Sequence, residues 1–379
     1  MRFPNKELLE FLQQEYPPGT RVRLTRMDDP QAPPLGTKGT VTGVDDIGSL
    51  LVVWDNGSHL NVSDIYTCQR THKPSERMTR RMKTLHFGIE MEMTGITREK
   101  AANLMAGFFG TGRGTYEGGA YDTYTALDNQ GRTWKAMSDS SIRPQRKVGG
   151  QIEGATRDYR TEVVSPILSY DDIPKLQELV RTLRKAGALV NTSCGIHIHV
   201  GAEKFTPKTL RNLVNLVASK EDMIYHALQI DALREARYCQ KTDETFLWEL
   251  NKKQPRTMAE FADIWYIQAP FGRDEHYNNS RYHGLNLHAT FTKGTVEFRL
   301  FNGTLHAGEI KAYIQFCLAV AHQALTQKKA SARKTETDNE KYAFRCWMLR
   351  LGLIGEEFKT CRLHMLKHLT GNSAWRNAA

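Results

Sequence analysis

The sequence predicts an α+β fold built on an antiparallel sheet and preceded by a small β-module. Over residues 84–325 strand-like segments are numerous and helical segments come in pairs, without the regular strand–helix alternation of a parallel sheet. Before residue 75, short alternating runs are separated by Gly and Asp turns, which is typical of small all-β domains. We therefore divide the chain into residues 1–75, 76–325 and 326–379.

The first part begins with a short amphipathic segment, residues 5–16, which predicts a helix ended by Pro17-Pro18-Gly19. Four or five short strands are expected after it, and the Asn56-Gly57 pair is a strong hairpin signal. Several short strands in so few residues predict an SH3-like barrel. Such barrels often bind peptides or nucleic acid, so we interpret this part as a recognition module.

Residues 69–83 are polar and strongly basic, which predicts a tether, with a phosphate-contacting arm as the alternative. The formal net charge of +10 permits a polyanionic partner such as nucleic acid, whereas a solvated basic surface is the plainer interpretation. The scattered cysteines include no CxxC pair and suggest neither a zinc ribbon nor a disulfide framework. No apolar run long enough to span a membrane and no signal-peptide core is present, so we expect a cytoplasmic protein without a membrane partner.

The central part combines helices and strands. Helical periodicity covers residues 97–109, 171–187, 206–228 and 307–325. The strand-like segments are residues 86–93, 133–141, 159–168, 195–201, 284–291 and 294–301. The glycine-rich run 110–119 lacks the form of a phosphate-binding loop, so we expect a mobile connector that could also act as a lid. After residue 326 a basic connector and a helical tail are expected to pack against this part.

Acidic and histidine residues recur on the predicted strands at a spacing that places them on one face. In the stretch FGIEMEM, residues 87–93, two glutamates stand ~7 Å apart, opposite the apolar side chains. Two more pairs, His197 with His199 and Glu297 with Arg299, are also two residues apart and have apolar neighbours. Each pair therefore projects to a single face of its strand. The strand residues of interest are Glu90, Glu92, Glu162, His197, His199, Glu297 and Arg299.

Taken singly, each pair could be an ordinary polar pair on a solvent-facing sheet. Taken together, acids with no lysine among them repel one another, and burying them unpaired costs several kcal/mol per ion. Divalent cations remove this repulsion, and oxygen-rich ligand sets favour Mg²⁺ or Mn²⁺. An arginine facing the same cavity would bind phosphate oxygens, because its planar fork suits them. Metal, arginine and carboxylates together are the apparatus of phosphoryl transfer.

The ordered set of motifs resembles the amidoligase family, whose members are carboxylate–amine ligases related to glutamine synthetase and glutamate–cysteine ligase. The matching motifs are ExE at 90–92, TEVVSPIL at 161–168, CGIHIHV at 194–200 and ExR at 297–299, and the segments 134–142 and 281–287 also fit. The resemblance covers about residues 84–325. Residues 1–75 resemble the small β-modules of DUF4314 type.

The resemblance implies a curved antiparallel sheet of glutamine-synthetase type that holds ATP and Mg²⁺ (or Mn²⁺) on its concave face. It implies an ATP-dependent amide ligase that forms an acyl phosphate, with an amino acid, a peptide or a protein side chain as substrate. The metal ligands that it implies are Glu90, Glu92 and Glu162, joined by His199 and Glu297, which alternatively hold the nucleotide phosphates. It also implies that Arg299 stabilises the transferred phosphoryl group and that His197 orients a ligand or binds the cofactor. Asp139 would position or deprotonate the amine. Nucleotide or substrate carboxylate would be bound by Arg160, Arg281 and Asn286.

Two other functions fit the same residues. A metal-dependent hydrolase would use the acids and histidines to activate water. A nucleic-acid-binding protein would use the basic surface and the N-terminal module, and its binding would weaken steeply with salt. Of the three hypotheses the ligase accounts for the most motifs.

Overall fold

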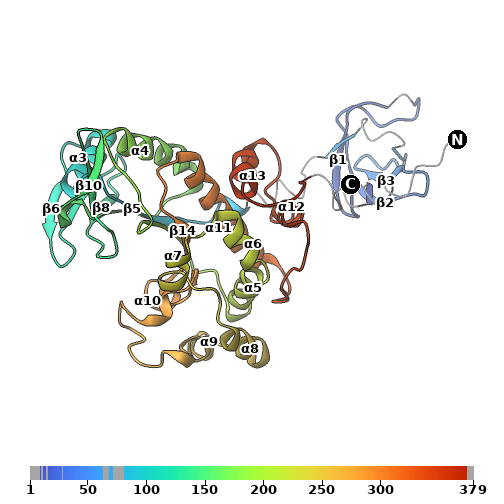
Figure 1. Cartoon of the computed structure of the whole chain (residues 1–379). Helices are drawn as coiled ribbons and strands as arrows, with labels where there is room; N and C mark the ends of the chain where they lie inside the picture. The colour runs from blue at the N-terminus through green and yellow to red at the C-terminus, as the bar shows by residue number, and fades with distance from the viewer. Residues whose placement is uncertain are drawn as a thin grey trace. The chain divides into compact units, whose positions relative to one another are not determined.

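The computed structural model describes residues 9, 12–13, 16–27, 29–62, 68–70 and 81–373. The chain forms two compact units, Met1–Arg80 and Arg81–Ala379, which are described separately (Figure 1). Most of the helix predicted over residues 5–16, and residues 71–80 of the predicted linker, lie outside the described residues.

The first unit holds a four-stranded antiparallel sheet in the order β3-β2-β1-β4. Its strands are β1 (Arg21–Leu24), β2 (Lys38–Val44), β3 (Leu50–Trp54) and β4 (Cys68–Arg70). Trp54 is buried in its core and donates from its indole nitrogen to the Leu60 carbonyl at 2.8 Å. The predicted turn follows β3, where Gly57 has a φ of 85° that glycine adopts without strain. Closure of this sheet into an SH3-like barrel stays a prediction.

The second unit is built on an eight-stranded sheet in the order β13-β14-β12-β5-β11-β8-β7-β6, and all its neighbours are antiparallel. This confirms the α+β class with a large antiparallel sheet. The strands are β5 (Phe87–Met93), β6 (Thr115–Gly118), β7 (Thr123–Leu127), β8 (Thr133–Met137), β11 (Thr161–Val164), β12 (Gly195–Gly201), β13 (Leu285–Asn286) and β14 (Thr295–Asn302). A separate hairpin consists of β9 (Gln145–Val148) and β10 (Gln151–Gly154).

One face of the sheet is covered by α3 (Arg98–Phe109), α4 (Ile173–Lys185) and α11 (Ala307–Thr326) (Figure 1). The remaining helices are α5 (Pro207–Ala218), α6 (Glu221–Leu228), α7 (Ala232–Arg237), α8 (Glu244–Lys253), α9 (Met258–Trp265), α10 (His288–Thr292), α12 (Glu340–Arg350) and α13 (Lys359–Leu366). Helix α13 packs against α11. None of the helices in the described part of the chain is both long enough and apolar enough to cross a bilayer.

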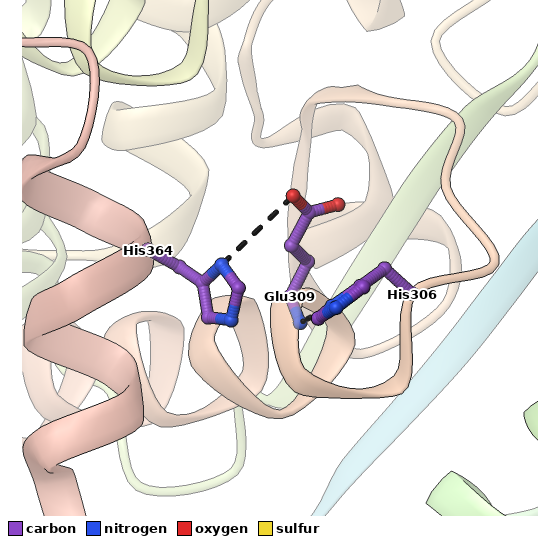
Figure 2. Close-up of side chains that lie close together, drawn as sticks. All are labelled: His306, Glu309 and His364. Carbon is purple, nitrogen blue, oxygen red and sulfur yellow. Dashed lines mark hydrogen bonds and ion pairs between the residues drawn. The ribbon is translucent and has the colours of Figure 1, made fainter.

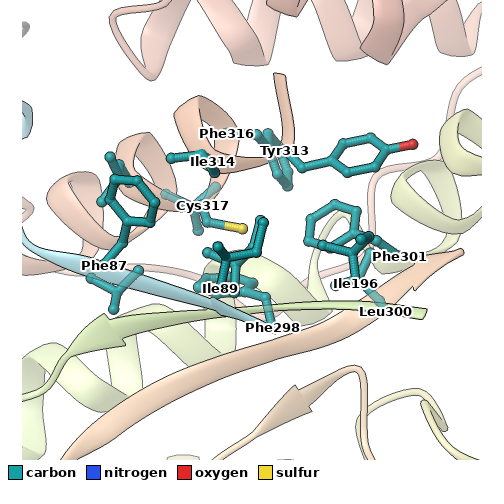
Figure 3. Packing of buried hydrophobic residues seen from close by; sticks show 14 of the residues in the cluster. Phe87, Ile89, Ile196, Phe298, Leu300, Phe301, Tyr313, Ile314, Phe316 and Cys317 are labelled. Carbon is teal, nitrogen blue, oxygen red and sulfur yellow. The ribbon is translucent and has the colours of Figure 1, made fainter. Parts of the chain in front are cut away.

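The core lies between the sheet and α11, which is apolar almost all round, as a buried helix should be (Figure 3). Ile89 of β5 faces this helix, and Phe301 stacks on Tyr313 with ring centres 4.3 Å apart. Because successive residues of a strand point to opposite faces, burying Ile89 against α11 directs its neighbour Glu90 to the other face.

Several segments differ from the sequence prediction, and three of them bear on the site or its surroundings. Residues 284–291 are not one strand, since β13 ends at Asn286 and α10 begins at His288. The Asn286 side-chain oxygen accepts a hydrogen bond from the His288 backbone nitrogen at 2.9 Å, and this local contact favours a turn over an extended chain. The predicted helix over 206–228 is divided into α5 and α6, and the end of the glycine-rich run forms the edge strand β6.

Asp172 anchors the start of α4 to the β7–β8 turn. Its carboxylate accepts hydrogen bonds from two Arg132 nitrogens at 2.9 and 3.0 Å, and Arg132 lowers the pKa of Asp172 to about 2. A lowered pKa stabilises the fold above the unfolded value of 3.8, and this stability is lost as the pH falls towards 2. We expect Asp172→Asn to lower the free energy of unfolding by about 1–2 kcal/mol at pH 7 and by little near pH 2. Urea unfolding at both pH values tests this, with the exposed neighbour Asp171→Asn as control; equal losses at both would contradict it.

Candidate active site

The strand register gathers the predicted polar residues on the face of the sheet opposite α11. His197 lies opposite Glu90, where β12 pairs with β5. Further pairings place His199 of β12 opposite Glu297 of β14, and Glu162 of β11 opposite Glu92 of β5. Cross-strand neighbours on one face are about 4.5–5.5 Å apart at their Cβ atoms. Four adjacent strands therefore present one continuous polar surface.

A bulge in β14 gives Arg299 its place on this surface. Phe298 pairs with Ile198 and Phe301 pairs with Ile196, so Arg299 and Leu300 together stand opposite the single residue His197. An extra residue of this kind bends the strand and redirects a side chain. Phe298 and Phe301 can thus both face α11, while Arg299 keeps its place beside the acids.

A cavity of about 550 Å³ lies against this surface. The predicted site residues that line it are Glu90, Glu92, Asp139, Glu162, His197, Arg281 and Arg299. Glu297 and Asn286 are buried and line a neighbouring cavity of about 200 Å³, which Arg281 also reaches. His199 is buried and touches Glu90, with its Nε2 3.2 Å from Glu90 Oε1. Arg160 lines neither cavity.

Glu90 is the acid with the most cationic surroundings. Its Oε2 lies 2.9 Å from His197 Nδ1, and its Oε1 lies 3.2 Å from His199 Nε2 and 3.5 Å from Lys293 Nζ. Burial alone would raise the pKa of Glu90, but His199, His197 and Lys293 hold it well below its usual range. Glu90 is therefore a carboxylate at neutral pH.

Glu297 is held in the same way by Arg299. Arg299 Nη1 donates to Glu297 Oε1 at 2.8 Å, and Asn286 Nδ2 donates to Glu297 Oε2 at 2.7 Å. Burial opposes ionisation, yet the charges of Arg299 and His199 lower the pKa of Glu297 to about 2. Glu297 and Glu90 in turn raise the pKa of His199 although burial acts in the opposite direction.

Glu92 and Glu162 show the opposite behaviour. Burial, reinforced by the charges of Glu90, Asp139 and Glu92, raises the pKa of Glu162 well above its usual range. Burial also raises the pKa of Glu92, although its Oε2 accepts a hydrogen bond from the Gly195 backbone nitrogen at 2.6 Å. The side chains around Glu162 therefore do not supply enough positive charge to balance its carboxylate.

The donor atoms fit a divalent cation. One atom each from Glu92, Glu162 and His197 lie within 4.8 Å of one another, and so do atoms of Glu90, His197 and Glu297. Carboxylate oxygens are the ligands that Mg²⁺ prefers. Burial and the neighbouring carboxylates raise the pKa of Glu162, and a divalent cation bound there would offset this repulsion.

Several lining residues had no sequence signal. The cationic ones are Lys135, Arg234 and Lys293, and the aromatic ones are Tyr121, Tyr238, His276, Tyr277 and Tyr282. The Tyr121 and Tyr277 hydroxyls lie 3.2 Å apart and join two loops that are distant in sequence. Arg281 lies over the Tyr277 ring, with its guanidinium carbon 5.5 Å from the ring centre. Apart from Lys135 of β8, none of them lies on a predicted strand, so sequence periodicity could not single them out.

A second group of possible ligands, His306, Glu309 and His364, lies where α13 meets α11 (Figure 2). These residues already have structural roles. His306 Nδ1 caps α11 by accepting from the Glu309 backbone nitrogen at 3.2 Å. The Glu309 carboxylate accepts from Lys367 Nζ at 2.5 Å and from Thr304 at 2.6 Å. We interpret this group as a helix cap and an ion pair that hold the tail helix on the body.

The fold and the cavity together define an α+β protein with an acid-rich site on an antiparallel sheet. Residues 83–321 match the family described as "Putative amidoligase enzyme", and the chain belongs to that family. This confirms the resemblance found in the sequence and supports an amide-bond-forming ligase in general. Residues 5–70 match a "Domain of unknown function (DUF4314)", as the sequence also predicted.

Two further comparisons add little. A search of the curated proteins found no match. Among solved structures, a bifunctional glutathione synthetase from Pasteurella multocida is similar with 10% sequence identity and a TM-score of 0.32. That similarity covers 78% of this chain and 48% of the other, so the chain spans about half the length of that protein.

Proposed function

We propose that the protein is an ATP-dependent carboxylate–amine ligase that forms an amide through an acyl phosphate. The observation that carries this proposal is that Glu90, Glu92 and Glu162 line one cavity together with Arg299. A carboxylate that attacks a triphosphate brings two anions together, so a site for this reaction needs cations on both. The family match supports the amide-forming half of the proposal.

In this proposal Glu90, Glu92 and Glu162 hold Mg²⁺, which when bound neutralises the phosphate oxygens and polarises the phosphoryl group. His197 Nδ1 lies 2.9 Å from Glu90 Oε2 and so orients that carboxylate, while its Nε2 is 3.7 Å from Glu92 Oε1. His199 Nε2 lies 3.2 Å from Glu90 Oε1, and of its predicted roles we propose binding of the nucleotide phosphates. Arg299, fixed on Glu297, faces the transferred phosphoryl group.

The chemistry has two steps. An oxygen of the substrate carboxylate bonds to the γ-phosphorus while the bond to the β,γ-bridging oxygen breaks, and ADP leaves. The amine nitrogen then bonds to the acyl carbon, the bond from that carbon to the phosphate oxygen breaks, and phosphate leaves. Asp139, on the rim of the cavity, takes the proton that the attacking amine loses. Asn286 holds Glu297, and the position of Arg281 in the lining of both cavities supports its binding of nucleotide or carboxylate.

The substrates that we propose are an amino acid, a peptide or a protein side chain. The cavity has both acids and bases in its lining, which suits a charged carboxylate and a charged amine. We also propose that the N-terminal module, as an SH3-like barrel, selects the substrate or binds a protein or nucleic-acid partner.

The deciding experiment is a screen of carboxylate and amine pairs for ADP formation with ATP and Mg²⁺. We expect ADP formation to require both substrates, and we expect Glu90→Gln to lower the rate on the order of 10²–10³-fold, because it removes one charge from the metal site. The exposed Glu99→Gln on α3 is the matched control and should leave the rate unchanged.

Other outcomes would favour other functions. Hydrolysis of an amide or phosphoester without ATP, lost in Glu90→Gln, would replace the ligase by a metal-dependent hydrolase. Salt-sensitive nucleic-acid binding, with every activity indifferent to Glu90→Gln, would replace it by a nucleic-acid-binding protein.

A further inference from the structure

Arg234 of α7 is a buried guanidinium without an adequate partner. Its side chain is 3% exposed, and its Nε makes no hydrogen bond within the part of the chain that the structure describes. The nearest carboxylate oxygen, Glu92 Oε2, is 3.9 Å from Nη1, and that oxygen already accepts from the Gly195 backbone nitrogen. Nη2 makes one long contact, 3.5 Å, with the Arg299 carbonyl.

Arg98 shows what a satisfied buried arginine looks like in this fold. It is 2% exposed, pairs with Asp122, and donates to the carbonyls of Arg157, Arg160 and Asp122 at 2.8, 3.0 and 3.1 Å. A buried charge without such partners destabilises a protein strongly. The contrast indicates that Arg234 is kept for a group that the chain itself does not supply.

The position of Arg234 identifies the chemistry of that group. Arg234 lines the main cavity together with Arg299. The Arg234 guanidinium packs against Gly195 at the start of β12. A Cβ atom at position 195 would lie 2.7 Å from Arg234 Cζ, so the glycine is needed for the guanidinium to reach this place. Glu297 engages Nη1 of Arg299 at 2.8 Å, whereas the Arg234 guanidinium makes only the 3.5 Å hydrogen bond with the Arg299 carbonyl among the described residues. A planar fork of free N–H donors matches an oxyanion.

We propose that Arg234 is the binding residue for an oxyanion of the reaction, either the transferred phosphoryl group or the substrate carboxylate. This inference rests on the proposed function for its mechanistic meaning, but anion binding can be measured without turnover. Arg234 adds its donors to those of Arg299, whose Nη1 is engaged by Glu297. Bound oxyanion and Arg234 then neutralise each other in the buried part of the cavity.

The first test titrates the full-length protein, with Mg²⁺ present, with orthophosphate and separately with acetate as a minimal carboxylate. The variants are Arg234→Met, which keeps the apolar volume, and Arg234→Lys, which keeps the charge but not the fork. Arg237→Met is the control, since Arg237 lies on the same helix but is exposed. We expect at least a tenfold loss of affinity for one of the two anions in both Arg234 variants and none in Arg237→Met.

The anion that is affected identifies its source. Loss of orthophosphate binding, with a fall in kcat and an unchanged KM for the carboxylate substrate, assigns Arg234 to the phosphoryl group. Loss of acetate binding, with a rise in that KM, assigns it to the carboxylate. The melting temperature distinguishes these two anion-binding roles from a purely structural role of Arg234. If Arg234 binds an anion, Arg234→Met should melt no lower than the wild type when no anion is present. Guanidinium ions should partly restore the activity of Arg234→Ala.

The inference fails if both anions bind Arg234→Met and Arg234→Lys as they bind Arg237→Met. It also fails if Arg234→Met melts well below the wild type while its anion affinities are unchanged, which is the behaviour of a structural residue. Absence of ADP formation by the wild type with every substrate pair would instead reject the proposed ligase, and the anion titrations would still decide the role of Arg234.

Discussion

Glu162→Gln is expected to lower the rate of ADP formation strongly and, at the same time, to stabilise the metal-free protein. Glu162 faces Glu90, Glu92 and Asp139, and burial together with these charges raises its pKa well above the usual range. Glutamine keeps the shape of the side chain and removes the repulsion. We expect a gain on the order of 1 kcal/mol in the free energy of unfolding without metal. Without this carboxylate the metal site is incomplete, so the activity should fall on the order of 10²–10³-fold.

Stability against pH gives an independent check on Glu162. A raised pKa in the folded state contributes stability that is complete below the unfolded pKa of about 4.3 and is lost as the pH rises through the folded value. Chelator-treated wild type should therefore lose stability as the pH rises above about 4.3, and Glu162→Gln should show a flatter profile. Mg²⁺ should raise the melting temperature of the wild type but not of the variant. If Mg²⁺ stabilises both equally, Glu162 is not a ligand.

Arg299→Ala is expected to damage both the activity and the fold. Arg299 donates to Glu297 at 2.8 Å, and Glu297 is 1% exposed. Removing the guanidinium leaves an uncompensated buried carboxylate, which typically costs about 3–5 kcal/mol. Loss of the charge that faces the phosphoryl group should lower the ADP-forming rate on the order of 10²–10³-fold. Urea unfolding and the ADP assay measure the two effects separately.

A second variant separates stability from catalysis at Arg299. In Arg299→Met with Glu297→Gln this ion pair leaves no buried charge without its partner, so much of the lost stability should return while the rate of ADP formation stays low. Because Arg299 lowers the pKa of Glu297 to about 2, the wild-type pair stabilises the fold above the ordinary value of 4.5, and this stability disappears as the pH falls through 2. An active double variant would remove Arg299 from the reaction.

The strands that carry the site could be read from the sequence because their pattern is local. In residues 87–93 and 195–201 the alternation of apolar and polar side chains predicts a strand with one polar face, and β5 and β12 have these bounds. The apolar helix over 307–325 is α11, one residue longer than predicted. Such patterns follow from the period of two or 3.6 residues in a single segment, and they need no knowledge of neighbours.

The site as a whole depended on contacts that no local pattern contains. The bulge opposite His197 places Arg299 beside the acids, and it is visible only in the pairing of β12 with β14. Residues 284–291 looked like a strand, but the Asn286 side chain caps the following turn and α10 begins there. Arg234 and Arg237 look alike in sequence, and packing alone buries the first over Gly195 and leaves the second exposed.

By itself, then, the sequence determined the family, the α+β class and the strands on which the acids stand, because these follow from the order of motifs and from periodicity along the chain. The tertiary structure decided which charges meet and which remain without a partner. That decision rests on strand register and burial, since a charge in a low-dielectric interior takes its state from the groups beside it in space rather than along the chain.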